Sequence, residues 1–292
     1  MKKILTLALL VIAVFASSVS AQILWKVEKP GNEHVTYILG THHFAPLSAL
    51  DSLKTLPTAL ENADKLYGEL DMAAMTTPES MMAMQQYLMA PADSTLDKVF
   101  TPVQLDSIKA VLDPLTGGQI PLEMLNQMKP AALSTQIASL SSMKIFPNLN
   151  PLEGLDMTMQ ERAKALGKPV AGLETVEFQM ESLYGTPIAE QAESLMKTIA
   201  DIDGEGERAK ELANAYMAHD LDSILKIMME EEENDDDYER LIFSRNDNWV
   251  KQLTEEMPSA SLMVVVGAGH LPSERGVLEQ LRKAGYTVTP AE

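Results

Sequence analysis

The fold class of this chain is decided by the stretch LMVVVGAGH, residues 262–270. Its first five residues are apolar without interruption, which is typical of a strand buried on both faces of a sheet. A glycine-rich turn follows, residues 276–284 predict a helix, and Gly285 predicts the end of that helix. Residues 286–288 then predict a final strand. This order of strand, helix and strand indicates an α/β fold.

The N-terminal part of the chain predicts further strands of the same sheet. Residues 23–27 (ILWKV) and 35–39 (VTYIL) are rich in β-forming residues, and the Pro-Gly-Asn segment between them predicts a hairpin. A helix is expected over residues 47–60, a strand at residues 65–70 and another strand at residues 169–173. We therefore predict a central mixed sheet that is built from N- and C-terminal segments.

Two helical blocks interrupt this pattern, at about residues 72–150 and 177–256, and we expect these helical insertions to form a cap over the carboxyl ends of the strands. The chain has 19 Met, many of them in the first block. Thioethers can bind Cu(I), but no His is interleaved with the densest Met run, so we interpret the Met residues as packing of a core or an apolar groove. The acidic residues 230–237 are interpreted as a solvated helix end or loop, because they lack the alternating ligands and central Gly of an EF-hand.

Composition and the first residues indicate an exported protein. Residues 1–21 have the basic start, apolar centre and small-residue cleavage site of a secretory signal. We expect residues 22–292 to form one domain, periplasmic or extracellular, with no transmembrane segment, because no later apolar stretch reaches roughly 18 residues. The absence of Cys excludes disulfides and thiolate nucleophiles. The formal net charge of -19 disfavours nucleic acid as a partner, and no feature indicates an oligomeric state.

Two histidine motifs share one pattern, in which an apolar strand leads into Gly-x-x-His and then into a proline and a helix. They are residues 40–43 (GTHH) and 267–270 (GAGH). In open α/β sheets, residues just past the carboxyl ends of the strands face the crevice that binds ligands. Glu69 and Glu174 follow two further predicted strands in the same way. Such imidazole and carboxylate groups suit zinc, manganese or a similar ion, or a metal-free site in which Glu orients a His base.

Several common catalytic motifs are missing from the sequence. It contains no His-Glu-x-x-His helix, no Gly-x-Ser-x-Gly elbow and no phosphate-binding Gly-x-x-x-x-Gly-Lys. The sequence therefore gives no support to a zincin or a serine hydrolase. His34 and His219 lie in a predicted turn and in a helical stretch rich in Ala and Asp, and both are expected at the surface.

These motifs and their order along the chain resemble the TraB/GumN family. The resemblance extends from Leu24 to about Pro290, and it is most specific in the paired Gly-x-x-His motifs and the Glu between them. The family includes Tiki-type proteins, which are divalent-metal-dependent proteases. The resemblance therefore implies His43, Glu69 and His270 as the metal-binding residues of this chain.

Two further positions bear on the resemblance. Arg245 and the following Asn246 are similar to an Arg-Asn segment of the family, which implies that Arg245 holds a substrate carboxylate or a developing oxyanion. At His42 the family usually has an apolar residue. Because neighbours on a strand point to opposite faces, we expect His43 rather than His42 to face the crevice, unless the turn has already begun.

We therefore expect an exported metal-dependent hydrolase that acts on peptide bonds, with a peptide or protein substrate and with manganese, cobalt or zinc as cofactor. Glu69, Glu174 and Arg245 are the expected catalytic residues, with Glu174 either a general base or a support for the metal site. The alternative is a non-catalytic protein that binds a metal, haem or a peptide in the same crevice. The sequence does not separate the two, because a catalyst and a carrier can share the same ligands.

Overall fold

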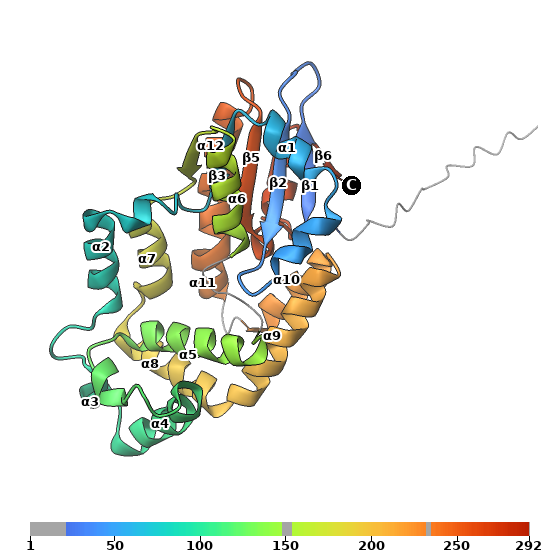
Figure 1. Cartoon of the computed structure of the whole chain (residues 1–292). Helices are drawn as coiled ribbons and strands as arrows, with labels where there is room; N and C mark the ends of the chain where they lie inside the picture. Colours follow the sequence, from blue (N-terminus) through green and yellow to red (C-terminus); the bar gives the residue numbers. More distant parts are fainter. Residues whose placement is uncertain (1–21, 148–153, 232–234, 292) are drawn as a thin grey trace, which may run out of the picture.

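The computed structural model describes residues 22–147, 154–231 and 235–291 (Figure 1). The expected signal at residues 1–21 lies outside the described residues, as does the centre of the acidic run, residues 232–234. Within the described ranges, no helix combines the length and the apolar character that crossing a membrane would need.

A six-stranded sheet forms the centre of the molecule, with the strand order β4-β3-β5-β2-β1-β6. Its strands are β1 (Leu24–Glu28), β2 (Thr36–Thr41), β3 (Lys65–Gly68), β4 (Val170–Gly172), β5 (Leu262–Gly267) and β6 (Thr287–Pro290). Strands β4, β3, β5 and β2 are parallel neighbours, whereas β1 pairs antiparallel with both β2 and β6. The predicted mixed sheet of N- and C-terminal segments is confirmed, and so is the hairpin of β1 and β2.

Helices pack around this sheet and make up most of the two long insertions. Those before β4 are α1 (Leu56–Asn62), α2 (Pro78–Leu88), α3 (Leu96–Val99), α4 (Pro102–Thr116), α5 (Pro130–Ile145) and α6 (Leu155–Ala165), with the 3-10 turns η1 (Leu47–Ser52), η2 (Ala74–Thr76) and η3 (Leu122–Leu125). Those after β4 are α7 (Val176–Tyr184), α8 (Ile188–Ala200), α9 (Ile202–Met217), α10 (Leu221–Glu231), α11 (Asp235–Tyr238), α12 (Ser244–Glu256) and α13 (Val277–Lys283), with the π-helical turn η4 (Glu239–Phe243) and the 3-10 turn η5 (Ala268–His270).

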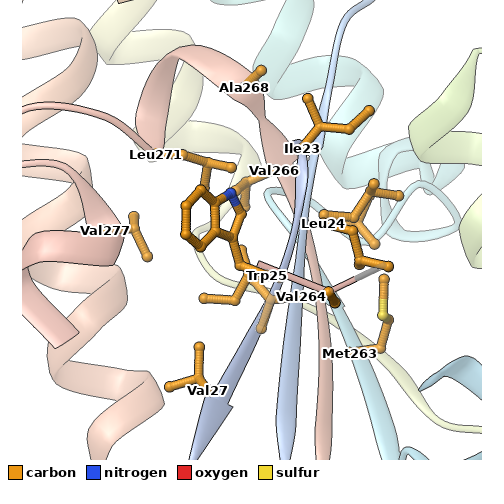
Figure 2. Packing of buried hydrophobic residues seen from close by; sticks show 14 of the residues in the cluster. Ile23, Leu24, Trp25, Val27, Met263, Val264, Val266, Ala268, Leu271 and Val277 are labelled. Carbon is orange, nitrogen blue, oxygen red and sulfur yellow. The ribbon is translucent and has the colours of Figure 1, made fainter. Parts of the chain in front are cut away.

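The core of the molecule lies on both faces of β5 and its neighbours. All five apolar residues at the start of β5 are buried. In β1 the side chains alternate, as a strand period of two requires: Trp25 and Val27 lie on one side of the sheet, and Leu24 lies on the other (Figure 2). Leu271 and Val277 pack on the Trp25 side (Figure 2). Burial on both faces is the reason why β5 is apolar without alternation.

The helical insertions have a core of their own at the carboxyl ends of the parallel strands. Helices α3, α4, α5 and α8 share a buried apolar cluster that is separate from the core of the sheet. The arrowhead of β2 points toward α5 and α9 in Figure 1. The insertions therefore lie at the carboxyl ends of the parallel strands, where the sequence predicts the crevice.

Two glycines of the histidine motifs permit close packing at this edge of the sheet. A Cβ atom at Gly40 would lie 2.8 Å from Cδ1 of Leu271 and 3.1 Å from Cα of Ala268, so a side chain there would push β2 away from the second motif. A Cβ atom at Gly267 would lie 3.2 Å from Oε1 of Glu69. Glycine at both positions lets the strand ends and their side chains meet.

Candidate functional site

Four of the predicted side chains follow four adjacent parallel strands. Glu174 comes after β4, Glu69 after β3, His270 after β5 and His43 after β2, and the strand order of the sheet is the same. Arg245, in the first turn of α12, contacts Glu174, Glu69 and His270. The parallel arrangement of the strands therefore brings together residues that are up to 227 positions apart in the sequence.

Glu69 is fixed at the centre of this group by hydrogen bonds. Its Oε1 accepts a hydrogen bond from the backbone N–H of Gly267 at 2.8 Å. Its Oε2 accepts hydrogen bonds from Nη2 of Arg245 at 2.6 Å and from Nε2 of Gln179 at 3.2 Å. Burial alone would raise the pKa of Glu69. The positive charges of His270, which is protonated in the acid range, and of Arg245 outweigh burial and lower this pKa to about 2. Glu69 is therefore a carboxylate at neutral pH.

Arg245 directs all of its guanidinium N–H groups to protein acceptors. Nε lies 3.1 Å from Oε2 of Glu174, and Nη2 lies 2.7 Å from Oε1 of Glu174 and 2.6 Å from Glu69. Nη1 donates to the carbonyl of Leu241 at 2.9 Å and lies 3.2 Å from Nε2 of His270. The π-helical turn η4, a feature frequent at functional sites, immediately precedes α12. Arg245 can hold a substrate anion only if it gives up one of these bonds.

Glu174 supports Arg245 and has little contact with solvent. Its side chain is 3% exposed. Besides Arg245, its carboxylate accepts hydrogen bonds from Nε1 of Trp249 at 3.1 Å and from Nε2 of Gln179 at 3.0 Å. Burial raises the pKa of Glu174, and Arg245 opposes that rise. This environment suits a residue that positions Arg245 better than a base that meets a water molecule.

His270 is buried and locked in one orientation. Nδ2 of Asn246 donates to the carbonyls of His270 and Arg275, so Oδ1 of Asn246 is the acceptor that faces Nδ1 of His270 at 2.7 Å. Nδ1 therefore carries the proton, and the Nε2 lone pair faces Arg245 and lies 3.9 Å from Oε1 of Glu69. Burial lowers the pKa of His270 to about 3, so its imidazole is neutral at pH 7.

His43 stands in an open environment beside Asp156, a residue that the sequence analysis missed. The side chain of His43 is 82% exposed, and its Nδ1 lies 3.9 Å from Oδ2 of Asp156. Asp156, in the first turn of α6, accepts a hydrogen bond from Oγ1 of Thr41 at 2.9 Å. Burial raises the pKa of Asp156. An Asp in the first turn of a helix is common, so the sequence gave no signal that would separate Asp156 from an ordinary helix-start residue.

His42 and His43 line the same cavity, because β2 ends at Thr41, before both histidines. Nδ1 of His42 accepts the backbone N–H of Phe44 at 3.2 Å, and its ring centroid lies 5.5 Å from that of Tyr216. Burial lowers the pKa of His42 to about 4. The alternation of a strand therefore does not decide between the two residues.

A cavity of about 530 Å³ connects these groups. Four of the five predicted site residues line it, namely His43, Glu69, Arg245 and His270. Residues of α5 and α9 also line it. Its volume lies within the range of small-molecule binding sites.

The donor atoms suit a divalent metal in kind, but only two of the predicted ligands lie close together. Glu69 is a carboxylate and His270 a neutral imidazole at pH 7, which are the forms that bind a metal. Their Oε1 and Nε2 atoms are 3.9 Å apart. Among the described residues, no three or more His, Asp or Glu side chains are grouped closely enough to hold an ion. His43 lines the cavity without joining the Glu69 and His270 pair.

Comparison with known proteins identifies relatives along almost the whole chain. The sequence profile of the TraB/PrgY/gumN family matches residues 23–290. The chain is 24% identical to "Metalloprotease TIKI1" of Xenopus tropicalis, over 92% of this chain and 61% of that protein. It is 23% identical to "Metalloprotease TIKI2" of Danio rerio, over 91% of this chain and 60% of that protein. The chain thus spans about three fifths of the length of these curated relatives. No solved structure matches it.

Proposed function

This chain belongs to the TraB/PrgY/gumN family, and from that membership we propose that it is a metal-dependent hydrolase that cleaves peptide bonds. The observation that carries the proposal is the placement of Glu69, His270 and His43 around one cavity at the carboxyl ends of parallel strands. The relatives named as metalloproteases support a metal and a peptide or protein substrate.

We assign the metal to His43, Glu69 and His270. A bound manganese, cobalt or zinc ion would supply an activated water at neutral pH and polarise the substrate carbonyl. The hydrogen bond between Nδ1 of His270 and Asn246 fits this role, because metal-binding histidines commonly donate their second ring N–H to a protein acceptor. Asp156 is placed to do the same for His43.

The two glutamates have separate tasks in this proposal. Glu69 lines the cavity and is ionised, so we assign it to the ion and to the reacting water. Glu174 is enclosed by Arg245, Trp249 and Gln179, so we assign it to holding the guanidinium in place. Of the two roles predicted for Glu174, general base or support for the metal site, we therefore propose the supporting role.

Arg245 contributes an N–H group to the substrate only after a ligand engages His270. Nη1 of Arg245 lies 3.2 Å from Nε2 of His270 in the described state. When Nε2 is used by a ligand, that N–H loses its acceptor and can donate to the carbonyl oxygen on which charge develops. Glu69 and Glu174 keep the remaining contacts of the guanidinium, so its position is retained.

The test is hydrolysis of a peptide library by the purified chain with added manganese, cobalt or zinc. We expect cleavage that depends on metal and that falls by at least about 100-fold in His270→Ala and in His43→Ala, because each variant removes a ligand and loss of a supporting group alone can cost that much. His219→Ala is the control, since His219 is not among the residues that line this cavity. Cleavage by both site variants at the normal rate would contradict the assignment.

The alternative is a carrier that binds a metal, haem or a peptide without chemistry. It uses the same cavity, because a carrier and a catalyst can share the same ligands. Metal analysis of protein purified without chelator, repeated on His43→Ala, separates the two. Tight stoichiometric metal without turnover supports the carrier, whereas weak metal that switches on cleavage supports the hydrolase.

A further inference from the structure

A second cavity, of about 520 Å³, lies beside the first and is walled by methionines from separate parts of the chain. Met72 and Met75 follow β3, Met143 lies near the end of α5, and Met157 lies in the first turn of α6. None of the four is fully buried, and Met143 is 36% exposed. Met159, two positions after Met157, is fully buried in the core of the sheet, so these four residues have a different role from core methionines.

The two cavities share part of their lining. His43, Phe44, Glu69 and Gln179 line both. A substrate whose reacting bond is held beside Glu69 therefore has the methionine wall next to it.

Gln160 and Asp156, two polar residues of the second cavity, are already hydrogen-bonded within the protein. Nε2 of Gln160 donates to the carbonyl of Leu70 at 2.8 Å, and its Oε1 accepts the backbone N–H of Met72 at 3.0 Å. Asp156 accepts the hydroxyl of Thr41. What the cavity offers to a ligand is therefore mainly apolar surface. Methionine side chains are flexible and polarisable, so such a wall adapts to apolar groups of several shapes.

Resting on the proposed function, we propose that this methionine-lined cavity is the subsite for a large apolar side chain of the peptide substrate, adjacent to the bond presented to Glu69 and His270. Its volume is sufficient for a bulky residue and exceeds what one small side chain would fill. The expected preference is broad among Leu, Met and Phe, and it excludes acidic residues, because Glu69 and Asp156 line the same cavity.

The experiment measures binding before cleavage. Acetyl-Ala-X-Ala-amide peptides, with X as Leu, Met, Ala or Asp, are titrated by NMR into the purified chain without added metal. We expect the Leu and Met peptides to bind about 10-fold more tightly than the Ala peptide, and the Asp peptide to bind most weakly. The double variant Met72→Gln with Met143→Gln should lower affinity for the Leu peptide about 10-fold and leave the Ala peptide unchanged. Met124→Gln, at a methionine that is 74% exposed on η3, is the matched control and should bind as the parent does.

Two outcomes overturn the inference: equal affinity for all four peptides, or unchanged affinity for the Leu peptide in the double variant. If the double variant does not fold, Met143→Gln alone decides, because its side chain is partly at the surface. The same peptides are then tested for cleavage with manganese, cobalt and zinc. Selective binding without any cleavage would support the subsite and contradict the proposed hydrolase. Cleavage without preference for X would support the hydrolase and contradict the subsite.

Discussion

His270 and His43 end motifs of the same sequence pattern, yet their surroundings differ in every physical respect. His270 is buried, its Nδ1 is hydrogen-bonded to Asn246, and its ring centroid lies 4.4 Å from that of Trp249. His43 is 82% exposed and has Asp156 at 3.9 Å. One side of the site is fixed in advance, and the other is open to solvent. A ligand that enters the cavity therefore meets a hydrogen-bonded, buried His270 and an exposed His43.

The largest expected effect comes from removing the centre of the rigid side. Arg245→Ala leaves the buried carboxylates of Glu69 and Glu174 without their common partner, so we expect the free energy of unfolding to fall by about 3–5 kcal/mol. Chemical denaturation measures this. Arg275→Ala is the matched control, because Arg275 also bridges two carboxylates but at the surface, and its removal should cost no more than about 1 kcal/mol. Equal losses of stability in the two variants would show that the buried ion pairs of Arg245 contribute no more to stability than the surface ion pairs of Arg275.

The next effect tests whether Asn246 is what makes His270 unlike His43. Asn246→Ala leaves the buried Nδ1–H of His270 and two backbone carbonyls without their partner, so we expect a loss of about 2 kcal/mol in stability. Asn248→Ala, at an exposed position two residues further along α12, should change stability by less than about 0.5 kcal/mol. Metal affinity should fall about 10-fold in the first variant only. An unchanged affinity would mean that the orientation of His270 does not depend on Asn246.

Acid should destabilise the folded chain through its buried histidines. Because burial lowers the pKa of His270 to about 3, the unfolded chain binds a proton at this position between about pH 6.5 and pH 3 that the folded chain does not bind. Stability therefore falls as the pH falls through this window, by at most about 1.4 kcal/mol per pH unit for this residue. Burial lowers the pKa of His42 to about 4, which adds to the slope in the same direction.

The variant that isolates this slope is His270→Gln. Unfolding free energies measured from pH 7 to pH 5 should depend less on pH in His270→Gln than in the parent, whatever the absolute stability of the variant. The same slope in both proteins would contradict the buried, neutral state of His270.

The sheet was predictable because its strands carry strong local signals. The apolar run of β5 and the glycines near the ends of β2 and β5 locate the strand ends, and parallel pairing then brings Glu69, Glu174 and His270 to one edge. The predicted strand alternation at His42 and His43 did not decide between them, because the end of β2 depends on its pairing with β5 and not on local sequence.

What the sequence could not predict depends on contacts between distant segments. Asp156 is 115 positions from Thr41, whose hydroxyl it accepts, and no spacing along the chain relates the two. We predicted that Arg245 holds a substrate anion, but all of its N–H groups already face acceptors of the protein. Those acceptors come from distant segments that only the fold brings together. Gln179 links both glutamates and was missed for the same reason.

The smallest expected effect is on the open side of the site, and it tests whether Asp156 orients His43. Asp156→Asn keeps the size of the side chain and an oxygen for the Thr41 hydroxyl, so stability should change by less than about 1 kcal/mol. The carboxylate beside Nδ1 of His43 is lost, so metal affinity should fall by up to about 10-fold if His43 is a ligand. Isothermal titration with manganese or zinc measures this loss. The loss should vanish in a His43→Gln background, because Asp156 then has no imidazole to orient. A loss of the same size in both backgrounds would mean that Asp156 acts on the metal directly, and the open side of the site would then consist of a carboxylate rather than of His43.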